Sequence, residues 1–305
     1  MTSLEDIIDS TLQNKDVVVR LQNIGVLRIT GLDARKFLQG QITCDINKLS
    51  AEHGLYGAIC SVKGRIITNF YLAQKGEDIL MLMSKDLVEK TLLHLKKYAV
   101  FFKAELINDS DSFVIHSKLT PSQSGSTENA QPELFNTRHD DDTITLTLCH
   151  NPLTIQWFIT QTGQAMIEEK HTELDALTLL SARPLITLEQ SENILPQWLN
   201  MQSIGGISFT KGCYTGQEIV ARMQYRGKSK KQLILATWDG HRETSLDITD
   251  KQGKNIGHVF AVANIEETHF AQIILNVEPN EVDNILLDNQ EVTLLPLPYP
   301  LDMKK

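Results

Sequence analysis

The sequence predicts an α+β fold that ends in a small antiparallel β-barrel or sandwich. Helical and long strand patterns are mixed over the first three quarters of the chain. The last quarter contains short apolar segments separated by Gly, Asn and Asp, which is typical of antiparallel β modules. A chain of 305 residues allows about two domains. We place the boundary between an α+β region over 1–230 and a β-barrel over 231–305.

The first elements of the α+β region are a helix, two strands and a second helix. Acidic residues in its first turn favour a helix over 3–12. Two apolar segments within 17–30 are separated by residues 23–25, a spacing that predicts a hairpin. Asp33 is expected to cap a helix over 34–39.

The middle of the chain is mostly strand. Strands are expected over 56–62, 65–74, 78–83, 100–107, 113–117, 143–149 and 154–160. Asp86 and Glu89 form a capping box for a helix to residue 97, and a further helix runs over 172–180. Residues 118–139 are polar and rich in turn formers, so we expect a mobile surface loop there.

The last quarter predicts four strands, over 232–238, 258–265, 270–277 and 292–295. Gly, Asn and Asp separate them, and such regularly spaced short strands predict a small antiparallel barrel or sandwich.

Composition restricts the partners and the compartment. Lys and Arg number 29 and Asp and Glu 38, so the formal charge is 29 − 38 = −9. A net negative charge repels phosphate, which argues against direct nucleic-acid binding. No apolar run reaches the ~18 residues that span a bilayer. The first residues also lack the basic and apolar segments of a signal peptide. We expect a cytoplasmic protein without a membrane partner.

The four cysteines predict free thiols rather than a disulfide scaffold or a metal site. Cys44, Cys60, Cys149 and Cys213 are widely spaced, and none lies in a C-x-x-C pair. The histidines are scattered singly, without the spacing of zinc ligands.

Residues 204–231 are the most unusual segment. A glycine-rich segment precedes a lone cysteine. A predicted helix start follows the cysteine, and a basic stretch follows that helix. Thr215 and Glu218 have the spacing of a capping box. On this helix Glu218, Arg222 and Arg226 share one stripe, which predicts a charged face opposite a core face.

Cys213 precedes this helix and lies beside Lys211 in the sequence. A helix N-terminus and a nearby ammonium both favour the thiolate and lower the pKa of a thiol. The alternative is a buried structural cysteine, the commonest fate of a free thiol. The basic residues that follow the helix are either a solvated turn or a binding site for an anion.

The motif Lys-Gly-Cys-Tyr-Thr-Gly-Gln-Glu over 211–218 resembles the signature of the YgfZ family of folate-binding proteins. These are similar in fold to the tetrahydrofolate-dependent aminomethyltransferase of the glycine cleavage system. Further blocks that resemble the family occur in order, at 37–43, 63–65, 96–101, 205–209 and 295–300. The resemblance implies an aminomethyltransferase-like folate-binding region of two interleaved subdomains. The resemblance also implies that a C-terminal β-barrel follows and that the parts are arranged around a central opening.

The resemblance also implies a function. It predicts a folate-binding accessory protein that supports iron–sulfur enzymes and tRNA modification, with Cys213 as the key thiol. The implied ligand is tetrahydrofolate or a folate derivative, and the implied partners are iron–sulfur client enzymes or assembly factors. We expect a pocket between the subdomains whose folate contacts come from Asn69, Lys211, Tyr214, Gln217, Glu218, Arg222 and Arg226.

Departures from the relatives bear on catalysis. Thr68 and Asn69 stand where the glycine-cleavage enzymes carry an acidic pair, and neutral side chains cannot act as the general base. This argues against a classical aminomethyltransferase, although a tetrahydrofolate-dependent one-carbon transferase remains the alternative. A third hypothesis is a cysteine-nucleophile hydrolase, whose base would be His116, His150 or His171.

Other departures bear on the pocket. Ile24 and Leu174 align with positions at which family members present tryptophans. Leu180 aligns with a position where an acidic residue is expected. Because aliphatic side chains stack less well on a flat heterocycle, we expect weaker folate binding than in those relatives.

Overall fold

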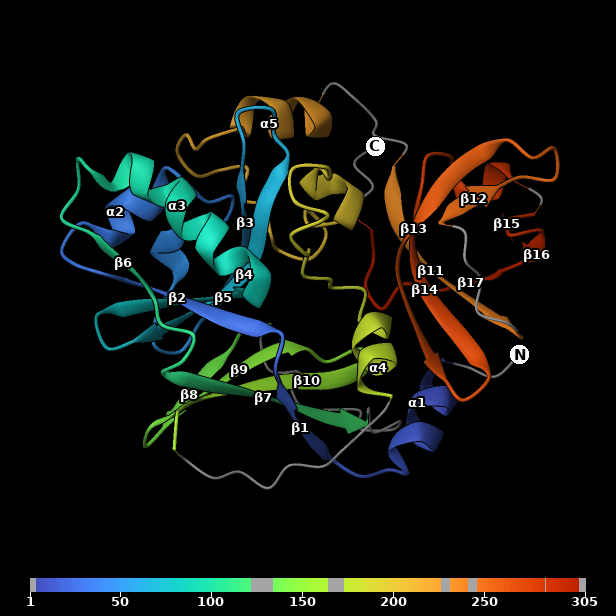
Figure 1. The fold of residues 1–305 in the computed structure, drawn as a ribbon, viewed down its shortest axis with the longest axis horizontal. Coiled ribbons are helices and arrows are strands. Elements are labelled where there is room, and N and C mark those ends of the chain that lie inside the picture. The colour runs from blue at the N-terminus through green and yellow to red at the C-terminus, as the bar shows by residue number, and fades with distance from the viewer. Residues whose placement is uncertain are drawn as a thin grey trace.

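The computed structural model describes residues 4–121, 134–163, 173–225, 231–240, 246–282 and 284–301. Three sheets form its framework, and helices cover their faces (Figure 1). All strand pairings described are antiparallel. The helices are α1 (Leu4–Leu12), α2 (Ala34–Gln39), α3 (Val88–Ala99), α4 (Leu174–Leu180) and α5 (Gln217–Tyr225). None of the helices in the described residues has the length and apolar character that a membrane span requires.

The first sheet has the order β3-β4-β5-β2-β6. Its strands are β2 (Ile24–Thr30), β3 (Leu55–Cys60), β4 (Ile66–Lys75), β5 (Asp78–Ser84) and β6 (Glu105–Asn108). The central strand β4 is buried from Ile66 to Ala73, on both faces of the sheet. Its apolar run therefore belongs to a fully covered strand rather than to one with a solvated face.

The second sheet has the order β1-β7-β10-β9-β8. Its strands are β1 (Val17–Leu21), β7 (Phe113–Pro121), β8 (Thr137–Asp140), β9 (Thr143–Cys149) and β10 (Leu153–Gln161). The hairpin predicted within 17–30 is wrong, because β1 pairs with β7 whereas β2 pairs with β5 and β6. The short break at Gln22 and Asn23 carries the chain from one sheet to another.

The third sheet has the order β16-β15-β12-β13-β14-β11-β17 and forms a nearly closed barrel. Its strands are β11 (Gln232–Asp239), β12 (Asp247–Thr249), β13 (Asn255–Ile265), β14 (Thr268–Leu275), β15 (Leu286–Leu287), β16 (Gln290–Glu291) and β17 (Thr293–Leu295). This confirms the predicted α+β class with a C-terminal antiparallel barrel. The exact division at residues 230/231 stays a prediction.

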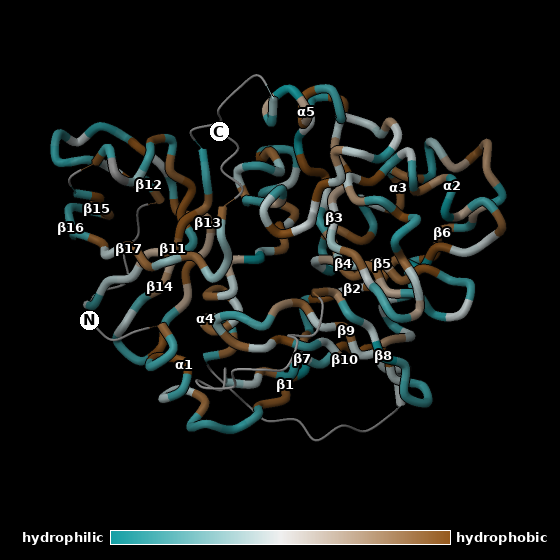
Figure 2. The backbone as a smooth tube through the Cα atoms, turned by 180° about the vertical axis from the view of Figure 1, so that it is seen from behind, coloured by the Kyte–Doolittle hydropathy of each residue, from teal (hydrophilic) through white to brown (hydrophobic). Residues whose placement is uncertain are grey.

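Apolar residues form one large core and a smaller one inside the barrel. The large core runs through the first two sheets and continues into the barrel at Leu233, Leu235 and Phe270. The smaller core includes Trp238 and Ile273. Figure 2 shows hydrophobic stretches along the strands and hydrophilic ones in many connecting loops. The shared core fixes the barrel against the rest of the chain.

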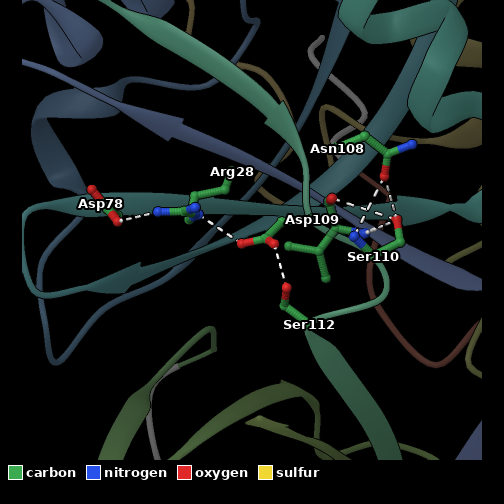
Figure 3. A network of polar contacts seen from close by, with 7 residues as sticks. Arg28, Asp78, Asn108, Asp109, Ser110 and Ser112 are labelled. Carbon is green, nitrogen blue, oxygen red and sulfur yellow. Dashed lines mark hydrogen bonds and ion pairs between the residues drawn. The ribbon is translucent and has the colours of Figure 1, made fainter. Parts of the chain in front are cut away.

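A polar network holds β2 to the connection between β6 and β7 (Figure 3). The Arg28 guanidinium contacts Asp78 at 3.2 Å and Asp109 at 2.6 Å. Ser112 donates a 2.5 Å hydrogen bond to Asp109, and the Val26 N–H donates to Ser110 at 3.1 Å. The network therefore anchors the segment that leads from the first sheet to the second.

Two side chains that were predicted to cap helices instead accept hydrogen bonds from distant backbone groups. The Asp33 carboxylate accepts from the Lys103 N–H at 2.8 Å instead of capping α2. The Asp86 carboxylate accepts from the Leu188 N–H at 2.9 Å, and α3 begins only at Val88. Each side chain joins distant segments, which a local motif does not reveal.

The strand predicted over 100–107 is too long, because β6 begins at Glu105. The loop predicted over 118–139 is also partly wrong. Residues 118–121 extend β7, and residues 137–139 belong to β8. Polar side chains are tolerated there because antiparallel strands can expose one face. Residues 122–133 of that loop lie outside the described residues.

Candidate functional site

The signature segment is attached to the loop that follows α2. The Lys211 ammonium donates hydrogen bonds to the carbonyls of Gln39, Ile42 and Cys44 at 2.8, 2.7 and 2.9 Å. The Thr215 N–H donates to the Gly40 carbonyl at 3.2 Å. The family-like blocks at 37–43 and 211–218 therefore form one structural unit.

The surroundings of Lys211 give it a structural role. Burial lowers its pKa to about 8, against the opposing attraction of the Asp45 carboxylate. Its Nζ also lies 5.2 Å from the ring centroid of Tyr214. Burial raises the pKa of the Tyr214 hydroxyl. An ammonium has three hydrogens, and all three have carbonyl partners here.

Two glycines allow the start of α5 to pack against the β3–β4 turn. Gly216 has φ +84°, and a Cβ there would lie 2.4 Å from the Ser61 carbonyl oxygen. Gly64 has φ +71°, and a Cβ there would lie 2.9 Å from Ile219. Only glycine combines this backbone conformation with so close an approach.

Helix α5 has the two faces that its sequence predicts. Val220 is fully buried, and its carbonyl accepts from the Gln197 amide at 2.7 Å. Gln217 is half-buried, whereas Glu218 and Arg222 are exposed. Arg226, the last member of the predicted stripe, lies outside the described residues.

Cys213 is exposed, whereas Cys44, Cys60 and Cys149 are buried. Burial raises the pKa of the Cys44 and Cys60 thiols to about 12 and that of Cys149 to about 11. The alternative of a buried structural cysteine therefore does not hold for Cys213. Among the described residues, no group of three or more His, Cys, Asp and Glu side chains is placed to hold a metal ion.

Asn69 lies in β4 and is fully buried. Its amide donates to the Tyr56 hydroxyl at 2.9 Å and to the Pro184 carbonyl at 2.8 Å. Its carbonyl oxygen accepts from the Ile186 N–H at 2.8 Å. Asn69 thus joins β4 to the segment after α4, and both of its N–H donors are already used.

A cavity of about 610 Å³ lies where the three sheets meet. Its described lining is Arg20, Leu21, Gln22, Asn23, Ile24, Tyr71, Ser117, Leu148, Ile155, Trp157, Leu174, Asp175, Thr178, Leu179, Ser181, Arg183, Pro184, Leu185, Ala261, Val262, Ala263 and Gln272. Ile24 and Leu174 are among these lining residues. Leu180 is fully buried and is not among the lining residues.

The cavity and the signature are separate parts of the molecule. No described lining residue comes from 204–225, and Asn69 is not among them. The structure therefore brings Lys211, Tyr214 and the start of α5 together with Cys213, but not with the cavity.

The histidines of the hydrolase hypothesis lie on other elements. His116 is in β7, and His150 directly follows β9. His171 lies outside the described residues.

Sequence reasoning missed the residues that give the cavity its chemistry. Trp157 alternates with Ile155 and Ile159 in β10, a period-two pattern that marks an inward face. Its ring packs edge-on against Tyr71, with centroids 5.2 Å apart. Arg183 is a lone charge in the otherwise apolar stretch after α4, which was the available signal.

The chain is 31% identical over 310 residues to the tRNA-modifying protein YgfZ of Escherichia coli O157:H7, across 93% of this chain and 94% of that one. The YgfZ protein of Escherichia coli K12 is also 31% identical, over 306 residues and the same shares. No family model matches. Among solved structures, the glycine cleavage system aminomethyltransferase T of Bartonella henselae has a TM-score of 0.69 at 13% identity. That match covers 98% of this chain and 90% of that one, which confirms the aminomethyltransferase-like fold.

Proposed function

Because the chain belongs to the YgfZ family of tRNA-modifying proteins, we propose that it supports tRNA modification as a folate-binding protein. Its ligand is tetrahydrofolate or a derivative, held in the cavity between the three sheets. Its second functional group is the exposed thiol of Cys213, which acts on iron–sulfur client enzymes or assembly factors.

The observation that carries the proposal is the cavity itself. Its volume of about 610 Å³ lies within the range of ligand sites, roughly 300–1,000 Å³. Tyr71 and Trp157 are the aromatic residues of the described lining, and a few polar groups interrupt its apolar surface. Ile24 and Leu174 provide less stacking surface than tryptophans do, so we expect weaker binding than in relatives that have them.

The geometry favours binding over one-carbon transfer. Thr68 and Asn69, which replace the acidic pair, are fully buried in β4, and Asn69 is engaged in three hydrogen bonds. Asp175 is the one carboxylate among the described lining residues, and it is exposed. A transferase needs a carboxylate at the reacting nitrogen, and the described lining offers none in the interior.

Cys213 acts on another macromolecule rather than on the folate, because it does not share the cavity. A single thiolate supplies too few ligands for a stable iron–sulfur cluster, so the client provides the others. The net charge of −9 also favours action through client enzymes over direct contact with tRNA.

The test is calorimetric titration with tetrahydrofolate together with a thermal-shift measurement, because a ligand specific to the folded state raises the melting temperature. The matched variant is Cys213→Ser, which should bind tetrahydrofolate as the wild type does. In cells that lack the endogenous relative, this variant should fail to restore tRNA modification by iron–sulfur enzymes. Absence of heat and of a melting shift at millimolar tetrahydrofolate overturns the folate role. Full complementation by the Ser variant overturns the thiol role.

A further inference from the structure

The Arg183 guanidinium is an unusual lining group of the cavity. Its Nε and Nη1 atoms are buried, and neither has a hydrogen-bond partner. The ring of Tyr299 lies 5.5 Å from Cζ and satisfies none of these N–H groups. Arginine stays protonated in proteins, and a buried charge without partners is costly. A ligand that accepts hydrogen bonds at this point removes that cost.

Gln272 offers the complementary group. Its side chain is 2% exposed and lines the same cavity. Its Nε2 donates to the Leu179 carbonyl at 2.7 Å, which fixes the orientation of the amide. The carbonyl oxygen Oε1 is buried without a partner. It is therefore an acceptor that awaits an N–H donor.

Both side chains lie near the C-terminal end of α4. The Leu179 carbonyl that accepts from Gln272 also accepts from the Ala182 N–H at 3.0 Å, and Arg183 is the next residue. The Tyr299 hydroxyl donates to the Ala182 carbonyl at 2.9 Å and holds this turn in place. A cationic donor and a neutral acceptor therefore line one cavity, and both are tied to the backbone at the C-terminal end of α4.

We propose that Arg183 and Gln272 recognise the lactam edge of a heterocyclic ligand. The oxo oxygen of the ring accepts from Arg183, and the adjacent ring N–H donates to Oε1 of Gln272. This rests on the proposed function, because the pterin ring of a folate carries such an edge. An acidic residue would instead pair with ring N–H donors alone, and Leu180 does not supply one here.

The experiment compares tetrahydrofolate with its 4-amino analogue by calorimetry under anaerobic conditions. The analogue replaces the oxo acceptor by an amino donor and the ring N–H by an acceptor, so both contacts become repulsive. The wild type should prefer the oxo form by roughly 10- to 100-fold, the effect of a buried polar group left unpaired. Arg183→Met and Gln272→Met should each lose most of that preference.

Arg20→Met is the matched control. Arg20 is exposed and also lines the cavity, so its loss should weaken both ligands to a similar extent without changing their ratio. The melting temperature of ligand-free Arg183→Met should equal or exceed that of the wild type, because an unpaired buried charge is removed.

The outcomes separate the two proposals. Equal binding of both forms by the wild type leaves the proposed function standing and overturns recognition by Arg183 and Gln272. A preference that survives in both Met variants overturns it as well, as does a lower melting temperature of ligand-free Arg183→Met. Binding of neither form overturns the proposed function and this inference with it.

Discussion

Replacement of Lys211 by Met tests whether its ammonium holds the signature segment to the loop after α2. The change keeps the apolar length of the side chain and leaves three backbone carbonyls without their donor. Three hydrogen bonds from a charged donor contribute about 4–5 kcal/mol. Burial of the ammonium opposes this by roughly 1–2 kcal/mol after a discount for solvent screening. The free energy of unfolding should therefore fall by about 3 kcal/mol.

The pH dependence of the free energy of unfolding provides a second test. The pKa of Lys211 is about 8 in the folded protein, below its ordinary value of 10.5. Between these values the unfolded chain binds more protons at this side chain than the folded one, so stability rises with pH. The wild type should therefore become more stable relative to Lys211→Met as the pH rises from 8 to 10.5.

Urea unfolding followed by circular dichroism measures both effects. Lys63→Met is the matched control, because Lys63 is an exposed lysine in the turn that packs against α5. It should change the free energy of unfolding by less than about 0.5 kcal/mol. Equal stability of Lys211→Met and Lys63→Met would refute the reasoning.

Three further predictions concern Asn69, two glycines and the cysteines. Asn69→Ala removes three buried hydrogen bonds and should destabilise the fold by about 3–4 kcal/mol in urea; a loss below about 1 kcal/mol contradicts this. Gly216→Ala should cost about 3 kcal/mol, because strain at positive φ adds to the overlap with a backbone carbonyl. Gly76→Ala, at φ +59° with open space around it, should cost only about 1 kcal/mol. Alkylation at pH 8 should modify Cys213 in the native protein and all four thiols only after unfolding; rapid native labelling of a second thiol argues against the burial described.

The sequence predicted most elements but not how they pair. Strand and helix patterns are local, so β9 agrees with its predicted range at both ends. Pairing depends on residues far away in the chain. The segment 17–30 shows this, because two neighbouring strands enter different sheets. Asp33 and Asp86 show the same limit, since each has the spacing of a cap and a distant backbone partner.

The sequence indicated one part of the candidate site, the motif at 211–218, but not the cavity. The motif at 211–218 singled out Cys213 because its residue order is distinctive. It did not indicate that Lys211 faces carbonyls, since carbonyls are present at every residue and leave no mark in the sequence. The cavity escaped prediction for a related reason. Its lining comes from all three sheets, and Arg183 becomes unusual only when its burial is known.

The contacts of Lys211 also set the order of events during synthesis. Gln39 and Lys211 are separated by 172 positions, so their hydrogen bond is a strongly non-local contact. At about 5–20 residues per second, a ribosome needs roughly 10–30 s to add the intervening chain. Until then the loop after α2 has three carbonyls without their native donor. A nascent chain halted before residue 211 should therefore be the species most exposed to chaperones and proteases, although its first sheet is already complete in sequence.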